Sequence, residues 1–483
     1  MNRGGSARPR AAVLAGALVL SLTALTACSA GGSGTVPGTV DGLPITHFHS
    51  GLKANAPTPD LKVQNAGTDQ ADTLAMDTIA DVQNFWSTEL PADFGVRFQP
   101  VSKLLSYESN GPDQVSGCGD TRGNENAFYC GQDDSVNWDR GVLLPEMIQQ
   151  FGQLSVVTVL AHEFGHAVQF RLGDKAGITA DTPSIVKEQQ ADCFAGTYYR
   201  WVVEGKSRYF TVSTSDGLNS ALSSLFLVRD TAGTAATDQQ AHGTAFDRIY
   251  AFQLGFEQGA KQCAALNMNN IQPRLTERPF DAGDQGNGDI PINQQAISYL
   301  QASLNQSFAG AKVPAPSIIA QTGSCPGGPA TPPASYCPAT NAVDIDLNAL
   351  AALGEPVDQQ GEFTGDTSGG HGDFAALSEI ASRYVIGIEK GVGASVDNAD
   401  AGLRTACLVG AWAAATTKIQ AQGKAQLRLS AGDLDEAISD LLRPDSLVAA
   451  DVDGNRVDAG FTRVEAMRTG YLQGSAPCST QYP

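Results

Sequence analysis

Basic residues are scarce in this chain, and long apolar runs are absent after Cys28. Lys and Arg number 31 against 51 Asp and Glu, a net charge of −20 over 483 residues. This charge disfavours binding to nucleic acid or to an anionic membrane through the surface, and it suits solubility outside the cell. Without a run of about 18 uninterrupted apolar residues beyond Cys28, no later membrane span is expected. The length is enough for two or three domains.

The N-terminal segment up to Ala27 has the pattern of an export signal. Three arginines precede an apolar run from Ala11 to Ala27, whose length is at the lower limit for a membrane span. The run ends in Leu25-Thr26-Ala27-Cys28, which resembles the lipobox of bacterial lipoproteins. An ordinary secretory signal or a short transmembrane helix is the alternative. We predict a signal peptide over 1–27 and lipidation of Cys28, which would anchor an extracytoplasmic protein to the cell membrane.

Eight cysteines remain once Cys28 is assigned to the lipid, and an even number is typical of disulfides in exported chains. Two pairs of these cysteines have identical spacing, and both second cysteines follow a tyrosine. Each disulfide would contribute about 2–4 kcal/mol, mainly by restricting the unfolded chain. Pairing between the two halves of the chain is the alternative to pairing within each half. The expected pairs are Cys118–Cys130, Cys193–Cys263, Cys325–Cys337 and Cys407–Cys478.

The cysteine spacing belongs to an internal repeat. The segment Arg248 to Cys263 matches Arg463 to Cys478, since 463 − 248 and 478 − 263 both equal 215. Further matches occur in the same order along the chain. We therefore predict a tandem duplication over roughly 70–270 and 285–483, whose copies can pack against each other.

Three stretches with the composition of loops or linkers separate or interrupt these regions. Residues 28–69 are rich in Gly, Pro, Thr and Ser, which is typical of a flexible tether, and they include His47 and His49. Residues 281–289 lie between the copies. A Gly-rich loop over 354–373 contains His371 and is predicted to be a surface insertion. No role follows for these three histidines.

The secondary structure expected from the sequence is α+β and mainly helical. An amphipathic helix is predicted over 77–90, with short strands at 127–129 and 136–138. Two further helices are predicted over 145–172 and 184–204, begun by prolines.

The first of these two helices carries an H-E-x-x-H pattern, His162-Glu163-Phe164-Gly165-His166, in an apolar run without proline. Residues i and i+4 of a helix project from one face, so the two imidazoles can hold one Zn²⁺ with Glu163 beside its open position. Such a helix is typical of a metallopeptidase site, in which Glu163 would act as the general base.

Zinc needs a third protein ligand, and Glu188 on the following helix is our candidate. Asp192 lies one turn beyond Glu188 on the same face, where it could accept a hydrogen bond from the outer nitrogen of His162. A solvated helix face is the alternative for both carboxylates.

Five blocks in this order resemble the bacterial putative neutral zinc metallopeptidase family over most of residues 75–265. The resemblance implies a zincin-like fold with Glu188 as the third ligand and one zinc ion per chain. It also implies that Asn126, Ala127, Phe128 and Tyr129 form a strand edge that pairs with an extended peptide substrate. The lipobox and the doubled architecture also look like a mycobacterial or related actinobacterial lipoprotein peptidase. The blocks are Cys118-Gly119, Phe128 to Cys130, His162 to Gln169, Glu188 to Gly196, and His242 to Thr244 with Arg248, Gly255 and Phe256.

The second copy lacks every proposed chemical residue. The two copies align on Leu160-Ala161 and Ile380-Ala381, and the later positions are counted from the cysteines and from Arg463. Each proposed chemical residue of the first copy then has a replacement in the second. This loss predicts a non-catalytic second copy. It also favours an active-site role for His242, our candidate second donor to the oxyanion, over a helix-cap or packing role. The replacements are His162 by Ser382, Glu163 by Arg383, His166 by Ile386, Glu188 by Gly402, Asp192 by Ala406 and His242 by Val457.

Two functions are compatible with these observations. The first is a lipid-anchored zinc endopeptidase that acts on peptides or proteins. The second is an envelope binding or scaffold lipoprotein with a structural or vestigial zinc site. The intact Glu163 favours the first, because a structural zinc site has no need of a general base.

Overall fold

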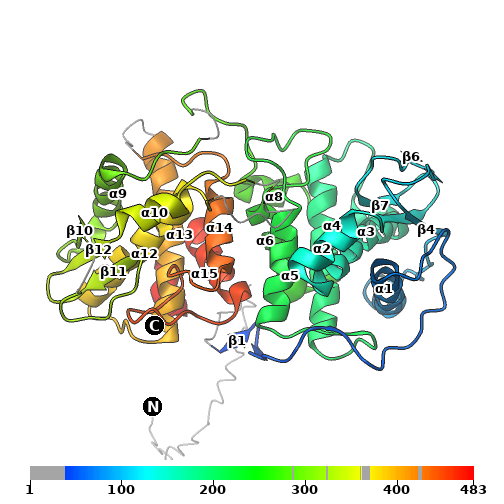
Figure 1. The fold of residues 1–483 in the computed structure, drawn as a ribbon, viewed down its shortest axis with the longest axis horizontal. Helices are drawn as coiled ribbons and strands as arrows, with labels where there is room; N and C mark the ends of the chain where they lie inside the picture. The colour runs from blue at the N-terminus through cyan, green and yellow to red at the C-terminus, as the bar shows by residue number, and fades with distance from the viewer. Residues whose placement is uncertain (1–37, 285–287, 322–324, 359–360, 362–369, 422–426) are drawn as a thin grey trace, which may run out of the picture. The chain divides into compact units, whose positions relative to one another are not determined.

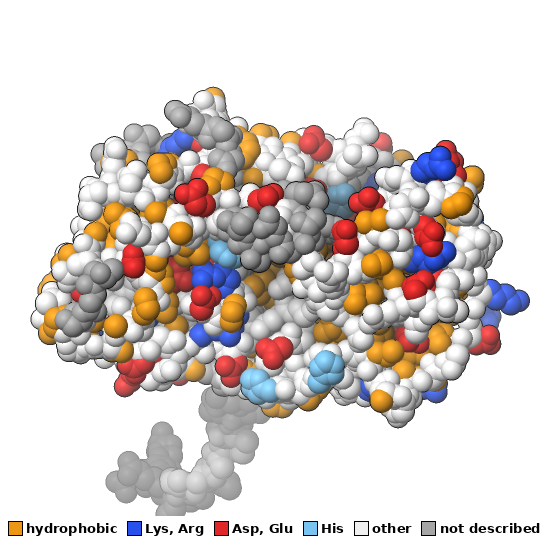
Figure 2. Space-filling view, in the orientation of Figure 1, with side chains coloured by type: hydrophobic (Ala, Val, Ile, Leu, Met, Phe, Trp, Pro, Cys, Tyr) orange, Lys and Arg blue, Asp and Glu red, His pale blue; other side chains and the backbone are white. Residues whose placement is uncertain are grey.

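The computed structural model describes residues 38–483 except 285–287, 322–324, 359–360, 362–369 and 422–426 (Figure 1). The predicted signal peptide and Cys28 lie outside these residues. Within the described part of the chain, no helix combines the length and apolarity needed to cross a membrane. On the face drawn in Figure 2, acidic side chains are spread over the surface rather than gathered in one patch.

The predicted tether is partly ordered. Strands β1 (Thr39–Val40) and β2 (Leu43–Pro44) form a hairpin around Asp41 and Gly42, whose φ angles are 43° and 76°. Asp-Gly favours such a turn because both central residues need positive φ. Strand β3 (Gly51–Leu52) pairs with β9 (Phe210–Thr211), which comes much later in the chain. A flexible tether up to residue 69 is therefore wrong from Gly38 onward, because this segment packs against the first half.

A small mixed sheet precedes the H-E-x-x-H helix. Strand β4 (Lys103–Tyr107) runs parallel to β8 (Ser135–Asp139), and β7 (Ala127–Cys130) pairs antiparallel with the other side of β8. Strand β7 is consequently an edge of this sheet, and it packs on the helix that follows. A separate two-stranded hairpin consists of β5 (Val115–Ser116) and β6 (Gly119–Asp120).

Helices make up most of the first half. The predicted helix over 145–172 is two helices, because Gly152 adopts φ 78° and ψ −178° between them. The helix predicted over 77–90 is longer at both ends. The helix predicted over 184–204 keeps its bounds to within one residue. The helices are α1 (Gln70–Phe94), α2 (Leu143–Phe151), α3 (Gln153–Leu172), α4 (Ser184–Val203), α5 (Asp216–Leu227), α6 (Ala245–Gln258), α7 (Ala260–Ala264) and α8 (Met268–Ile271).

Two glycines allow α4 to lie close to its neighbours. A Cβ at Gly165, within the H-E-x-x-H pattern of α3, would lie 2.6 Å from the Cα of Ala191 on α4. A Cβ at Gly255 on α6 would lie 1.7 Å from the carbonyl oxygen of Cys193 on α4. Glycine at both positions permits these close helix crossings. Helix α4 is thereby held against both α3 and α6.

The main helices and the three-stranded sheet of the second half follow the order of those in the first half, without counterparts of β5, β6 and β9 among the described residues (Figure 1). Its sheet also places a parallel and an antiparallel neighbour on either side of one strand. The strands are β10 (Ser317–Ala320), β11 (Ala334–Cys337) and β12 (Ala342–Ile345). The helices are α9 (Gln294–Ser307), α10 (Leu347–Leu353), α12 (Asp373–Gly391), α13 (Ala399–Ala421), α14 (Asp433–Leu442), α15 (Gly460–Gln473) and α16 (Ala476–Gln481).

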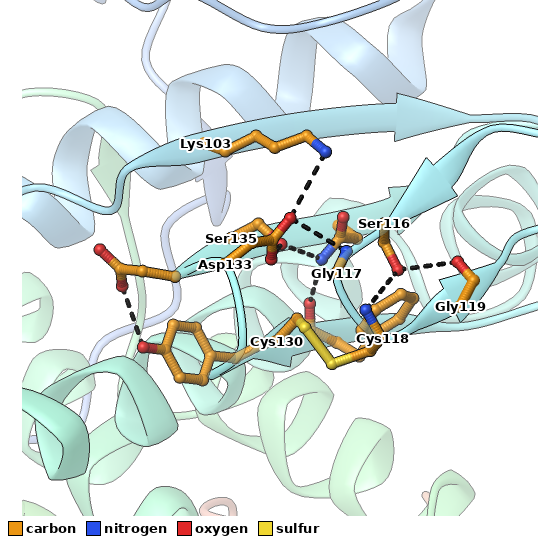
Figure 3. Close-up of a disulfide and its surroundings, with 12 residues drawn as sticks. Lys103, Ser116, Gly117, Cys118, Gly119, Cys130, Asp133 and Ser135 are labelled. Carbon is orange, nitrogen blue, oxygen red and sulfur yellow. Dashed lines mark hydrogen bonds and ion pairs between the residues drawn. A yellow bond between two sulfur atoms is a disulfide. The ribbon is translucent and has the colours of Figure 1, made fainter.

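Four disulfides join the pairs that the sequence predicts. Figure 3 shows Cys118–Cys130, which ties the β5–β6 hairpin to the end of β7. Beside it, the Asp133 carboxylate accepts hydrogen bonds from the Gly117 amide and the Ser135 hydroxyl, and it pairs with Lys103 at 3.4 Å. Burial tends to raise the pKa of Asp133, but these three partners lower it. The disulfide therefore lies beside a carboxylate whose hydrogen bonds and ion pair hold this end of the sheet together.

The two halves meet through α6 and α15. The ring of Phe246 on α6 lies 5.3 Å from that of Tyr471 on α15, and Phe256 on α6 lies 4.9 Å from Phe461 on α15. Adding 215 to Phe246 and Phe256 gives Phe461 and Tyr471, so the two ring pairs are reciprocal. The halves thus contact each other through the same face on each side, as in a two-fold interface.

Candidate metal centre

Three side chains converge on one point between α3 and α4. His162 and His166 lie one helical turn apart on α3, and Glu188 reaches them from the second turn of α4. The His162 Nε2 atom lies 3.2 Å from Glu188 Oε2, and His166 Nε2 lies 3.5 Å from Glu188 Oε1. All three side chains are buried or nearly so. For a tetrahedral ion with bonds of about 2.0–2.1 Å, neighbouring ligand atoms lie about 3.3 Å apart, which these distances match.

Hydrogen bonds on the outer side of each imidazole leave both Nε2 lone pairs facing Glu188. His162 Nδ1 lies 2.7 Å from Asp192 Oδ1, so Nδ1 carries the proton. His166 Nδ1 lies 3.0 Å from Gln169 Oε1, and the Gln169 amide nitrogen is committed to the Lys187 carbonyl, which fixes the orientation of that amide. When both imidazoles are neutral, three acceptors face one another, and nothing then donates to the buried Glu188 Oε2. A cation resolves this conflict, and the donor set of two imidazoles and a carboxylate fits zinc.

The charges at this centre are strongly coupled. Burial lowers the pKa of His162, but the carboxylates of Asp192, Glu188 and Glu163 outweigh it and raise the pKa to about 10. The pKa of Glu188 lies well below its usual value, because the two imidazoles outweigh the effect of burial. Protons therefore compete with a cation for this centre, and metal affinity should fall as the pH falls.

Arg248 completes the support of the centre. Its Nε and one Nη each donate to the Asp192 carboxylate at 3.0 Å, and its other Nη donates to the Val228 carbonyl at 2.6 Å. Arg248 is 2% exposed, and Asp192 is fully buried. A buried carboxylate needs such partners to remain ionised, and burial raises the pKa of Asp192 while Arg248 and His162 lower it further than burial raises it. Arg248 thus holds the carboxylate that orients His162.

Replacing this arginine should weaken zinc binding without removing a ligand. We expect Arg248→Met to raise the zinc dissociation constant about 10–100-fold, because Asp192 no longer fixes the His162 ring. Competition with a fluorescent chelator measures this change. Arg463→Met is the matched control, since Arg463 is equally buried but donates to the carbonyls of Leu441, Val457 and Asp458. Equal losses of affinity in both variants would contradict the positioning role of Arg248.

Glu163 lies beside the triad and is held by the sheet edge. Its Oε1 is 4.0 Å from His162 Nε2, and its Oε2 accepts a hydrogen bond of 2.9 Å from the Tyr129 amide of β7. The second oxygen is therefore fixed, while the first faces the metal side.

Strand β7 presents only alternate residues along its free edge. The Asp139 amide donates to the Asn126 carbonyl, so Asn126 faces β8, and by alternation so does Phe128. The Tyr129 amide points away from β8 to Glu163, and Ala127 shares this direction. Of the four predicted substrate-binding residues, Ala127 and Tyr129 are thus the two that face the free edge, and at Tyr129 only the carbonyl is left for an extended peptide.

His242 is not in contact with the triad among the interactions of the described residues. It lies two residues before Thr244, which caps α6, and its ring is about half exposed. Its Nδ1 lies 3.3 Å from Asp230 Oδ1, and its amide donates to the same carboxylate. A role as donor to the oxyanion stays a prediction.

The three other histidines lie elsewhere. His47 is exposed and lies 3.7 Å from Asp458, and the His49 carbonyl accepts from the Thr211 hydroxyl at 3.3 Å. His371 Nδ1 lies 3.0 Å from the Ser439 hydroxyl. These partners belong to other parts of the described chain than the centre on α3.

Sequence reasoning missed Gln169 and Arg248 as supports of the centre. Gln169 is recoverable, because it follows His166 by three residues and lies on the same helix face. Arg248 is 86 residues from His162, and no local pattern joins the two positions.

In the alignment that the predicted repeat gives, Arg383 on α12 stands at the position of Glu163. Its guanidinium is fully buried and donates to the carbonyls of Asp451, Leu447 and Ala450 at 2.6–2.8 Å. A fixed side-chain cation therefore lies on α12 where α3 carries the metal-binding pattern.

Comparison with known proteins places the chain in a family. A family model described as "Putative neutral zinc metallopeptidase" matches residues 15–266, just over half of the chain. The uncharacterized protein Rv2575 of Mycobacterium tuberculosis is 29% identical over 226 residues, which are 42% of this chain and 74% of the relative. The uncharacterized protein YpfJ of Escherichia coli K12 is 26% identical over 205 residues, 40% of this chain and 69% of the relative. No solved structure shows significant similarity. Since the matched region contains the whole buried triad, the chain belongs to the putative neutral zinc metallopeptidase family.

Proposed function

We propose that this protein is a zinc endopeptidase that hydrolyses peptide bonds in peptides or proteins, with one zinc ion per chain. The observation that carries the proposal is the convergence of three lone-pair donors, His162, His166 and Glu188, beside a glutamate that is not needed to hold the ion. Structural zinc sites are closed by four protein ligands, whereas three ligands leave a position open for chemistry.

Each protein group has a defined task in this proposal. His162, His166 and Glu188 would hold the zinc, which would supply Lewis-acid chemistry for activating water and polarising the scissile carbonyl. Glu163 accepts the proton of the attacking water on its Oε1 and passes it to the leaving amine, while the Tyr129 amide keeps its Oε2 in place. The free edge of β7 at Ala127 and Tyr129 aligns the substrate backbone. His242 would donate to the oxyanion if substrate binding moved the segment before α6 toward the triad.

We also propose that 70–270 is the peptidase domain and that 285–483 is a degenerate duplicate without catalytic function. Buried polar contacts support this proposal. Gln190 on α4 donates to the carbonyls of Ala176 and Leu266, and Arg404 on α13 donates to those of Ser395 and Tyr482. Gln190 and Arg404 occupy matching positions in the two halves, and so do the carbonyl groups that they bind, although the two side chains differ. The second copy then acts as the partner in a two-fold interface within one chain.

Export, lipidation at Cys28 and anchoring to the cell membrane complete the proposal. Lipidation and anchoring rest on the N-terminal sequence. The four disulfides favour an oxidising compartment.

The test is made on the full chain, purified without chelator. We expect about one zinc per chain by mass spectrometry and cleavage within a peptide library. Activity should be lost on zinc removal and restored by zinc. The alternative, a scaffold with structural zinc, predicts unfolding when zinc is removed and no cleavage by the zinc-loaded chain.

A further inference from the structure

A second group of buried carboxylates lies on elements that take no part in the zinc centre. Asp289 precedes α9, Asp373 is the first residue of α12, and Glu436 lies in the first turn of α14. One ligand atom from each lies within 4.8 Å of the others. Asp373 is 5% exposed and Glu436 is 8% exposed.

One oxygen in this group has no partner. Asp373 Oδ2 accepts from the Ile290 amide at 2.8 Å, but Oδ1 is buried with no hydrogen-bond donor. Glu436 Oε2 accepts from the Phe374 amide at 2.8 Å. Glu436 can reach that amide only because residue 372 is glycine, since a Cβ there would lie 2.0 Å from its carboxyl carbon. The chain therefore brings Glu436 against Asp373 and leaves a buried acceptor unsatisfied.

The surrounding charges do not balance. Asp289 and Glu436 line a cavity of about 360 Å³ together with Asp435 and Arg229. Arg229 supplies one positive charge, and the N-termini of α6, α12 and α14 supply roughly +0.5 each. Five carboxylates thus surround one arginine, and a divalent cation would offset part of this excess when they are ionised. The five carboxylates are Asp289, Asp373, Asp433, Asp435 and Glu436.

We propose that Asp289, Asp373 and Glu436 bind a calcium ion. All three ligands are carboxylates, and calcium prefers oxygen ligands and tolerates irregular geometry. Magnesium demands near-ideal octahedral geometry, and zinc favours nitrogen and sulfur ligands. The cavity beside Asp289 and Glu436 gives room for water to complete the coordination.

Calcium at this place would join the segment between the halves to two helices of the second half. Asp289 belongs to the segment between the halves, whereas Asp373 and Glu436 begin two core helices. The neighbouring Asp435 accepts from the Phe246 amide at the start of α6, so the group also lies beside the first half. An ion bound only by the folded chain stabilises it in proportion to occupancy.

The close packing of these carboxyl groups also shifts their pKa values. Burial raises the pKa of Asp373 to about 7, and burial with the neighbouring carboxylates raises those of Asp433 and Glu436 well above their usual values. Asp289, Asp433 and Glu436 face Asp373, with Asp435 and Arg229 across the cavity. The pKa values of these carboxyl groups are higher in the folded chain than in the unfolded chain. The groups therefore stabilise the fold fully below about pH 4, and this stability is lost as the pH rises through about 7. Calcium replaces the missing protons, so it should stabilise the protein more at pH 8 than at pH 5.

The test is a calcium titration of the full, zinc-loaded chain at pH 8, by calorimetry and thermal unfolding. We expect a binding heat and a rise in melting temperature of about 5 °C at a hundredfold excess over the dissociation constant. Magnesium at the same concentration should give a much smaller rise. The variant with Asp373→Asn and Glu436→Gln should lose the calcium response and keep its zinc. Glu188→Gln should lose zinc and keep the calcium response, so the result does not depend on the proposed peptidase.

Two results would overturn the proposal. One is the absence of both a binding heat and a melting shift in the wild-type chain. A double variant more stable than the wild type at pH 8 would then show that the carboxylates share protons rather than a metal. The other is an equal response to magnesium and calcium, which would rule out a calcium site.

Discussion

Glu163→Gln should lower kcat/KM for peptide cleavage by about 10²–10⁴-fold and leave the zinc content unchanged. Glutamine is isosteric with glutamate, and its amide oxygen can still accept the hydrogen bond from the Tyr129 amide. The substitution therefore removes the proton acceptor without removing a zinc ligand or the contact with β7. Single-turnover cleavage of a peptide identified in the library screen measures the loss.

The control for Glu163→Gln is the same substitution of glutamate by glutamine at an exposed site. Glu355 is exposed in the second half, and Glu355→Gln should keep full activity. A Glu163→Gln variant that binds zinc and cleaves at the wild-type rate would remove Glu163 from the mechanism. A variant that loses zinc would instead show that Glu163 supports the metal rather than the proton transfer.

The parts of the centre that the sequence predicts are those encoded by helical spacing. His162 and His166 share a helix face because they are four residues apart, and the structure places Asp192 2.7 Å from His162 Nδ1. Glu188 and Asp192 are one turn apart on the next helix. Such proximity follows from periodicity once the helices are identified.

The remainder depends on tertiary packing. Arg248 reaches Asp192 only because Gly255, two turns further along α6, lets that helix lie against α4. The residues of the calcium proposal come from three segments, and their nearness requires the N-termini of α12 and α14 to meet. The break at Gly152 was missed because a single glycine in an apolar helical pattern is usually tolerated. The Asp41-Gly42 hairpin was missed because composition was weighed above the turn signal.

The second large effect is expected at Arg383. Arg383→Met should lower the free energy of unfolding by about 3 kcal/mol, because three carbonyl groups lose a charged donor in the buried interior. Glu379 and Glu389 also lose a nearby positive charge, and burial already raises the pKa of Glu389 to about 7. Urea unfolding followed by tryptophan fluorescence measures the change. Arg122→Met, at an exposed arginine, is the matched control and should change stability by less than about 0.5 kcal/mol.

The Arg383 result bears on how the second half keeps its fold without a metal pattern. In the first half, a cation between α3 and α4 would satisfy Glu188 and the two imidazoles. In the second half, α12 and α13 lack those ligands, and the Arg383 guanidinium supplies the buried positive charge. Zinc content should therefore stay at the wild-type level in Arg383→Met while stability falls. A loss of less than about 1 kcal/mol would mean that apolar packing alone holds α12, and that the arginine does not take over the structural part of the metal's role.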